Sequence, residues 1–191
     1  MSERYKGILF YTMENDQAIG LTCHFKFEKA SVLQKYCPQP SGNRPICNGC
    51  GPAGYGAVVP DSILGVDIKI CGDIHNWGYQ FGLDREDKMV VDETFRDNMD
   101  RIIRADFEHE TRVEQQKYFE AIRAIKSTNS LVRKIRSRWA DYCHQRKTEY
   151  LKEMYESRLT IAGDIYAKAV MVFGGSSFWD KRPINFRLED I

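Results

Sequence analysis

The chain has 191 residues and a mass of 22.2 kDa, and 42% of its residues are hydrophobic, which is enough for one compact core. Its formal net charge of +1 provides no strongly basic field, so we expect no nucleic acid partner. No apolar run reaches transmembrane length, and the first residues lack the pattern of a cleavable signal. We therefore expect a protein that is cytoplasmic as synthesised, with its six cysteines mostly reduced, while export by another route and the oligomeric state stay open.

Two runs rich in β-branched and aromatic residues lie near the N-terminus. They cover residues 7–13 and 19–27 and flank the polar run at residues 14–17, a pattern that predicts a β-hairpin. Residues 38–45 are rich in proline and predict a loop. We expect residues 1–46 to form this hairpin and loop, and residues 47–191 to form a helical domain within one globular unit.

A glycine-rich run follows the loop and contains Gly49, Gly51 and Gly54. Glycine reaches backbone dihedrals that other residues avoid, so such a run can bring several carbonyl groups toward one ligand. Carbonyl oxygens suit a hard cation, above all calcium. A surface turn explains the same residues equally well.

The cysteines around this run suggest a different metal site, one for zinc. Cys47 and Cys50 have the spacing of half a zinc site, and Cys37 and Cys71 would have to complete it. The spacing of that second half is irregular. A zinc-stabilised interaction domain is therefore a minor alternative, and buried free thiols are the ordinary interpretation.

Residues 70–81 have the periodicity of a helix that ends near Gly82. Its apolar stripe contains Ile70, Ile74, Trp77 and Phe81, and along the edge of this stripe lie Cys71, His75 and Tyr79. The next helix begins near Asp84, and its inward stripe of Phe95, Met99, Ile102 and Ile103 is headed by Asp92. A carboxylate on a buried stripe needs a partner. The sequence therefore predicts a hydrogen bond between His75 and Asp92 across two antiparallel helices, with a structural or a catalytic role.

The motif Cys71-x-x-x-His75-Asn76-x-x-Tyr79, with the preceding run Cys50-Gly51-Pro52-Ala53-Gly54 and the inward Asp92, resembles the secreted-type phospholipase A₂ superfamily. The small bacterial and phage-like members are the most similar, and residues 165–170, 173–175 and 178–179 resemble the C-terminal end of that group. The resemblance implies a mainly α fold, with a phospholipase A₂-like core of antiparallel helices to which this chain adds the hairpin and a long helix.

The resemblance also implies a calcium-dependent hydrolysis of phospholipid esters. His75 would be the general base, Asp92 would orient it, and Tyr79 would support Asp92. The glycine loop and the residue after the histidine would hold calcium, and Ile74, Trp77 and Phe81 would line an acyl slot. The family has aspartate after the histidine, whereas this chain has Asn76. A neutral amide is a weaker ligand than a carboxylate, so we expect weak calcium binding and weak activity, or a non-catalytic binding module on the same scaffold.

The C-terminal half is polar and helical in pattern. Residues 127–130 predict a break with an N-cap, followed by a long helix to Glu156 and a last helix over residues 159–172. The long helix has a narrow apolar stripe of Val132, Ile135, Trp139 and Tyr142 among many basic residues. Such a helix either lies on an anionic membrane surface or is simply solvated.

Overall fold

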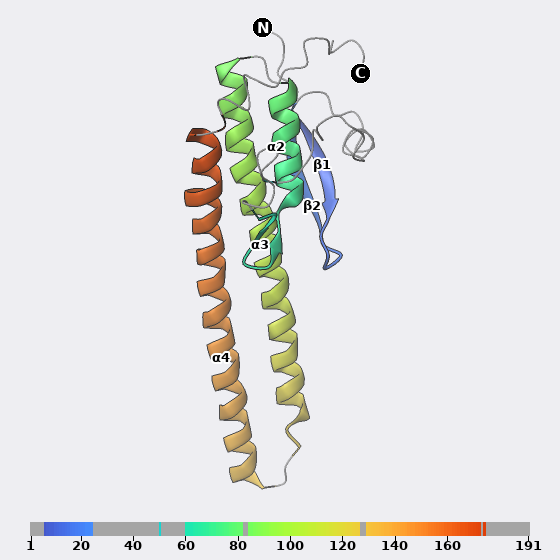
Figure 1. The fold of residues 1–191 in the computed structure, drawn as a ribbon. Helices are drawn as coiled ribbons and strands as arrows, with labels where there is room; N and C mark the ends of the chain where they lie inside the picture. The colour runs from blue at the N-terminus through green and yellow to red at the C-terminus, as the bar shows by residue number, and fades with distance from the viewer. Residues whose placement is uncertain are drawn as a thin grey trace.

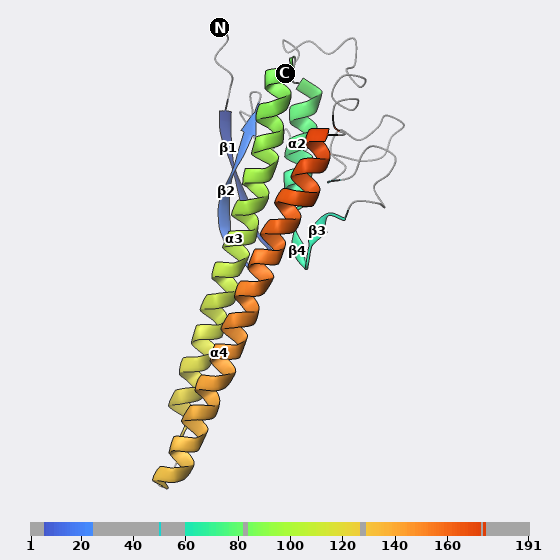
Figure 2. The same cartoon turned by 90° about the vertical axis from the view of Figure 1, so that its left-hand side faces the viewer.

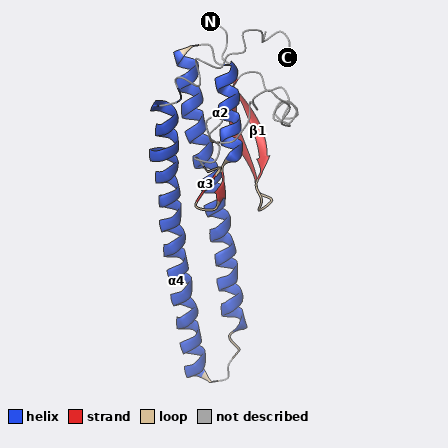
Figure 3. Ribbon diagram, in the orientation of Figure 1, coloured by secondary structure: helices blue, strands red, loops and turns tan. Residues whose placement is uncertain are grey.

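The computed structural model describes residues 6–24, 50, 60–81, 84–126, 129–172 and 174. This part of the chain is mainly helical, with a small antiparallel sheet near the N-terminus, as the sequence predicts (Figures 1 and 3). The elements are β1 (Lys6–Thr12), β2 (Ala18–His24), β3 (Ser62–Ile63), β4 (Val66–Asp67), α2 (Lys69–Phe81), α3 (Arg85–Ala124), α4 (Ser130–Thr160) and the π-helix η1 (Ile161–Ala167).

The predicted N-terminal hairpin is confirmed. Strands β1 and β2 pair antiparallel from Lys6 opposite His24 to Thr12 opposite Ala18. The turn between them is held by the side chain of Asn15, whose Oδ1 accepts a hydrogen bond from the backbone N–H of Gln17 at 3.0 Å. Asp16 adopts a positive φ of 61° there, a conformation that aspartate tolerates better than most residues.

The amide side chain of Asn98 hydrogen-bonds this hairpin to the long helix α3. The Oδ1 of Asn98 accepts the backbone N–H of Thr22 at 2.8 Å, and its Nδ2 donates to the backbone carbonyl of Thr22 at 2.8 Å. Asn98 is fully buried, so each bond satisfies a backbone group that has no access to water. One turn along α3, Arg101 donates to the carbonyl of Gly20 at 3.0 Å.

The second hairpin, β3–β4, is absent from the sequence prediction. Its turn places Leu64 at φ 46° and Gly65 at φ 88°, the two positive dihedrals of a tight two-residue connection. The guanidinium of Arg158 on α4 donates to the carbonyl of Leu64 at 3.0 and 3.3 Å, and to Asp106 and Glu110 on α3 at 2.9 and 3.2 Å. One buried arginine therefore ties together the turn and both long helices, which Figure 2 shows side by side.

The helix starts follow the capping residues in the sequence. Asp84 is the N-cap of α3 and accepts the N–H of Asp87 at 2.8 Å, and Asn129 is the N-cap of α4. The prediction of a separate last helix over residues 159–172 is wrong. Helix α4 continues directly into η1 and then into helical residues 168–172, because neither glycine nor proline interrupts residues 156–160.

The core lies where the hairpin, α2, α3 and η1 meet. It contains the predicted stripe of α3 and buried residues from both hairpins: Leu21, Cys23, Ile63, Val66, Phe95, Met99, Ile102, Ile103, Ala162 and Tyr166. The N-terminal hairpin and the helices thus share one hydrophobic interior. None of the described helices combines the length and the apolar character needed to cross a bilayer.

Replacing Asn98 with Ala should lower the free energy of unfolding by about 2–4 kcal/mol, because two buried backbone groups of Thr22 lose their partners at once. Urea denaturation monitored by circular dichroism measures this change. Asn15→Ala is the matched control, since its single bond lies in an accessible turn and should cost less than about 1 kcal/mol. Equal losses in the two variants would contradict the role given to Asn98.

Candidate functional site

Helix α2 holds His75 on its buried side. The helix begins where Asp67 accepts the backbone N–H of Lys69 at 2.8 Å, and its inner face buries Cys71, Ile74 and Trp77 in the interior. His75 is only 6% exposed, and its ring lies against Tyr79 and Phe95 with centroid distances of 4.1 and 4.8 Å. The periodicity of the sequence therefore predicts the inward direction of this imidazole correctly.

Helix α3 brings two charged groups to the same place. Asp92 is 2% exposed, and Lys88 lies one turn before it on the same face. The Nζ of Lys88 bonds to Oδ2 of Asp92 at 2.6 Å and to the carbonyl of Val170 at 3.3 Å. A buried carboxylate and a buried ammonium thus neutralise each other within one helical turn.

The predicted contact between the two helices is confirmed. Nε2 of His75 lies 3.0 Å from Oδ1 of Asp92, and the hydroxyl of Tyr79 donates to the same oxygen at 2.6 Å. The Tyr79 hydroxyl also lies 3.4 Å from the carbonyl of Val170. Asp92 therefore receives hydrogen bonds from His75, Tyr79 and Lys88, a group that we call the Asp92 network.

Two glycines permit this close arrangement. A Cβ atom on Gly78 would lie 2.6 Å from both γ carbons of Val91, so α2 approaches α3 more closely at this point than any side chain would allow. A Cβ atom on Gly174 would collide with the hydroxyl of Tyr79. The glycines at these positions keep the helices and the C-terminal turn within reach of the Asp92 network.

The surroundings shift the pKa of each member. Burial lowers the pKa of His75 below its ordinary value of 6.5, and this effect outweighs the hydrogen bonds to Asp92 and Asn76, which favour the protonated ring. Burial alone would raise the pKa of Asp92, but the hydrogen bonds from His75, Lys88 and Tyr79 outweigh it and hold that pKa below 3.8. Burial and the bond to Asp92 raise the pKa of Tyr79, which therefore acts as a donor. At neutral pH the imidazole is neutral and the carboxylate is ionised.

The remaining predicted site residues fall into three groups. Ile74 and Trp77 are buried in the interior, and their role in an acyl slot stays a prediction. Asn76 is half-buried and its side chain hydrogen-bonds to the His75 imidazole. Outside the described part of the chain lie the side chain of Phe81 and the residues Cys37, Cys47, Gly49, Gly51 and Gly54.

Cys50 and Cys71 are both free thiols. Burial raises the pKa of Cys50 to about 12 and that of Cys71 well above 9.0, and the neighbouring Cys50 raises the pKa of Cys71 further. Within the described residues, no group of three or more histidine, cysteine or acidic side chains is placed to hold a metal ion. The zinc alternative rests on Cys37 and Cys47, whose positions the structure does not describe.

Two groups of the site, Lys88 and the carbonyl of Val170, are not among the site residues predicted from the sequence. A signal for Lys88 was present, because a lysine four residues before an inward aspartate shares its face. The Val170 carbonyl had no such signal, since it reaches the site only through the path of the chain after η1. No family model, curated protein or solved structure matches the chain.

The geometry of the Asp92 network supports proton transfer at His75. An ionised Asp92 accepts the Nε2–H and so selects the tautomer in which Nδ1 carries the lone pair. Protonation of Nδ1 would give an imidazolium that Asp92 stabilises directly. The same contacts also hold two helices together, so geometry alone is compatible with a structural role.

Replacing Lys88 with Met should lower the free energy of unfolding by about 3 kcal/mol, because a buried carboxylate loses its cation. Lys168→Met is the matched control. Lys168 also pairs with an aspartate four residues away, Asp164, but both side chains are more than half exposed, so this loss should be much smaller. Chemical denaturation compares the two variants, and similar losses would show that the Lys88 pair is not effectively buried.

The Asp92 network should make stability fall in acid. The pKa of His75 is lower in the folded chain than in the unfolded one, so its contribution is fully present above pH 6.5 and is lost as the pH falls below that value. The lowered pKa of Asp92 adds a second loss below pH 3.8.

His75→Gln isolates the first of these losses. Denaturation curves of wild type and variant should differ in their pH dependence between neutral pH and about pH 5, with the steeper acid loss in wild type. Parallel curves across this range would contradict the lowered pKa of His75.

Proposed function

We propose that the chain is a phospholipase A₂-like hydrolase that acts on a carboxylic ester of a phospholipid. The observation that carries the proposal is the hydrogen-bonded set of His75, Asp92 and Tyr79 on two packed helices. These are the residues that the resemblance assigns to the base, the orienting carboxylate and its support. A phospholipase A₂-like core is part of the same proposal.

In the proposed reaction, a water molecule attacks the ester carbonyl while Nδ1 of His75 removes its proton. The new bond forms between the water oxygen and the carbonyl carbon. The imidazolium, held by Asp92, then returns the proton to the departing alkoxide, whose bond to the carbonyl carbon breaks. The low pKa of His75 favours this role because the imidazole is neutral at pH 7 before the reaction begins.

Calcium would polarise the ester carbonyl in an enzyme of this family, but the described residues around His75 provide few oxygen ligands for such an ion. Asn76 provides one neutral oxygen, and its side chain already hydrogen-bonds to His75. The neighbouring carboxylates of Asp92 and Asp73 are paired with Lys88 and Lys69. These donors do not make a calcium site without further ligands. We expect calcium to bind weakly, at millimolar concentrations.

One observation favours a second function, a non-catalytic binding module on the same scaffold. Asn76 supplies a neutral amide where the resembled family has the calcium-binding aspartate, so a metal-assisted reaction would lack its charged ligand. The Asp92 network would then serve stability alone. The two functions differ in what happens when a carboxylate is restored at position 76.

Asn76→Asp should tighten calcium binding and increase hydrolysis of phospholipid, because a charged ligand replaces a dipole beside the imidazole. Calcium titration followed by thermal shift measures binding, since a site stabilises by about 2.7 kcal/mol at a hundredfold excess over Kd. Release of fatty acid from phosphatidylcholine micelles measures hydrolysis.

Adding His75→Ala to the Asn76→Asp chain is the control, and it should abolish hydrolysis while leaving calcium binding largely intact. The enzymatic proposal fails if Asn76→Asp changes neither calcium binding nor fatty acid release. In that case we would retain the second proposal, that the chain is a non-catalytic binding module.

A further inference from the structure

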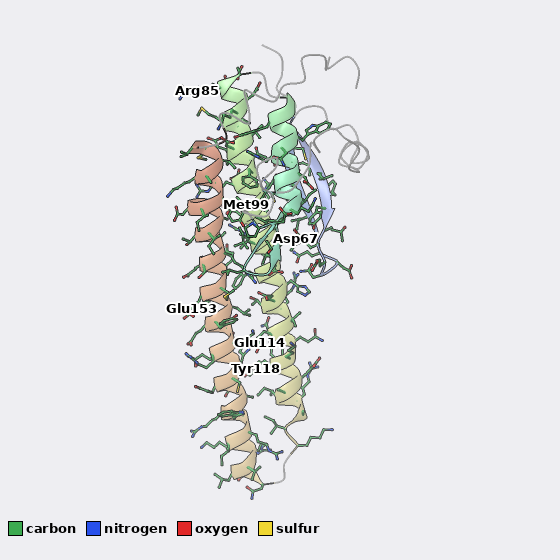
Figure 4. All side chains as sticks on the ribbon, viewed as in Figure 1. Asp67, Arg85, Met99, Glu114, Tyr118 and Glu153 are labelled. Atoms are coloured by element: carbon green, nitrogen blue, oxygen red, sulfur yellow. The ribbon has the colours of Figure 1, made fainter. Side chains whose placement is uncertain are left out.

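The distal ends of α3 and α4 form an arm that extends beyond the rest of the molecule. Figures 1 and 2 show both helices continuing past α2 and the sheets, side by side and without a third element from the described part of the chain. The arm is held together from within. The Tyr118 and His144 rings stack at 4.4 Å, the Tyr118 hydroxyl donates to Asp141 at 2.7 Å, and His144 lies 3.5 Å from Glu114. Figure 4 labels Glu114 and Tyr118 on the α3 side of the arm.

The opposite face of α4 carries a row of exposed apolar residues, which we call the distal stripe. Its members Leu131, Ile135, Trp139 and Tyr142 are exposed by 63%, 59%, 66% and 55%. Ile135 and His144 are nine residues apart, which is two and a half helical turns, so the stripe points directly away from α3. The rings of Trp139 and Tyr142 lie 5.8 Å apart, and the spacing of three or four residues places all four members along one face of the helix. The predicted stripe of Val132, Ile135, Trp139 and Tyr142 is exposed to solvent, and Val132, at 37%, is less exposed than Leu131 beside it.

The stripe is bordered by positive charge. Residues 130–140 contain four basic side chains and no acidic one: Arg133, Lys134, Arg136 and Arg138. Residues 130–150 contain six basic and two acidic residues, a net charge of +4, whereas the whole chain has +1. The remainder of the chain thus has a net charge of −3. Positive charge is concentrated on the helix that exposes the apolar row.

We infer that the distal stripe docks on an anionic phospholipid surface. Aliphatic side chains and the amphipathic rings of Trp139 and Tyr142 suit the boundary between acyl chains and headgroups, and the bordering cations suit anionic headgroups. A second copy of the chain fits less well, because two such stripes would bring like charges together. A nucleic acid would use the cations and leave Leu131 and Ile135 in water.

The inferred surface is separate from the Asp92 network. About 35 residues of helix lie between Ile135 and Val170, a separation of about 50 Å at 1.5 Å per residue. The stripe would therefore anchor the molecule, and it would do so even if His75 had no catalytic role. Docking through the distal stripe and hydrolysis at His75 are therefore independent, and either can fail without the other.

Vesicle flotation of the full chain tests the inference, with vesicles of phosphatidylcholine alone and of phosphatidylcholine mixed equally with phosphatidylglycerol. Wild type should float with the mixed vesicles only, and added salt should release it. Ile135→Ser combined with Trp139→Ser should abolish flotation. The matched control is Ile8→Ser combined with Phe10→Ser, which removes two apolar residues of β1 that are exposed by 56% and 80%; this variant should float as wild type does.

Charge reversal is the second measurement. Arg136→Glu with Arg138→Glu should weaken vesicle binding at least about tenfold, since each cation near an anionic surface contributes substantially. Lys117→Glu with Lys152→Glu makes the same change in net charge elsewhere and should change binding much less. His75→Ala should float as wild type does, which separates docking from hydrolysis. Circular dichroism confirms that each variant folds.

Several results would overturn the inference. Failure to recover wild type with the mixed vesicles is one, and flotation of the stripe variants to the same extent as wild type is another. Loss of flotation in the β1 control would place the docking surface on the hairpin. A wild-type dimer in analytical ultracentrifugation that the stripe variant converts to monomer, without vesicle binding, would assign the stripe to a second copy.

Discussion

A carboxylate removed from water organises this protein. Asp92 is 2% exposed, and an ion in that position is tolerated only when its oxygens are hydrogen-bonded and its charge is balanced. The donors come from α2 through His75 and Tyr79, and from α3 through Lys88. The carbonyl of Val170 in turn meets Lys88 and Tyr79, so the last helical turns are aligned by the same group. The packing of three helical segments is thus linked to one buried charge.

The same charge balance affects any chemistry at His75. While the imidazole is neutral, the charges of Asp92 and Lys88 cancel. A proton taken from water by His75 would therefore leave one net positive charge in the interior. Lys88 itself lowers the pKa of His75, so the cation that stabilises Asp92 makes the imidazolium harder to form. Without Lys88, the His75 imidazole would be a stronger base, but the fold would be less stable because Asp92 would lose its cation. Stability and proton transfer therefore place opposite demands on Lys88.

Periodicity in the sequence was sufficient to predict the hairpin, the helices of the site and the contact between His75 and Asp92. Periodicity could not show whether a given face of a helix packs against another element or lies in solvent. The stripe that begins at Val132 has the spacing of a buried face and is exposed, whereas Lys88 has the charge of a surface residue and is buried. The hairpin β3–β4 escaped prediction because it is held by distant residues: Arg158, ninety-four residues after Leu64, bonds to its turn, and Ile63 and Val66 pack into the shared core. Contacts between distant parts of the chain decide these cases.

The side chain of Asn98 also protects the open edge of β2 from pairing with another chain. A two-stranded sheet presents unpaired backbone groups along its outer strand, and such an open edge is a template for another chain to add a strand. Asn98 occupies both backbone groups of Thr22, and Arg101 occupies the carbonyl of Gly20, two residues along the same strand. Helix α3 thereby blocks the edge of β2 with side chains where a larger sheet would use a further strand. The hairpin can remain small without inviting intermolecular β-pairing on that side.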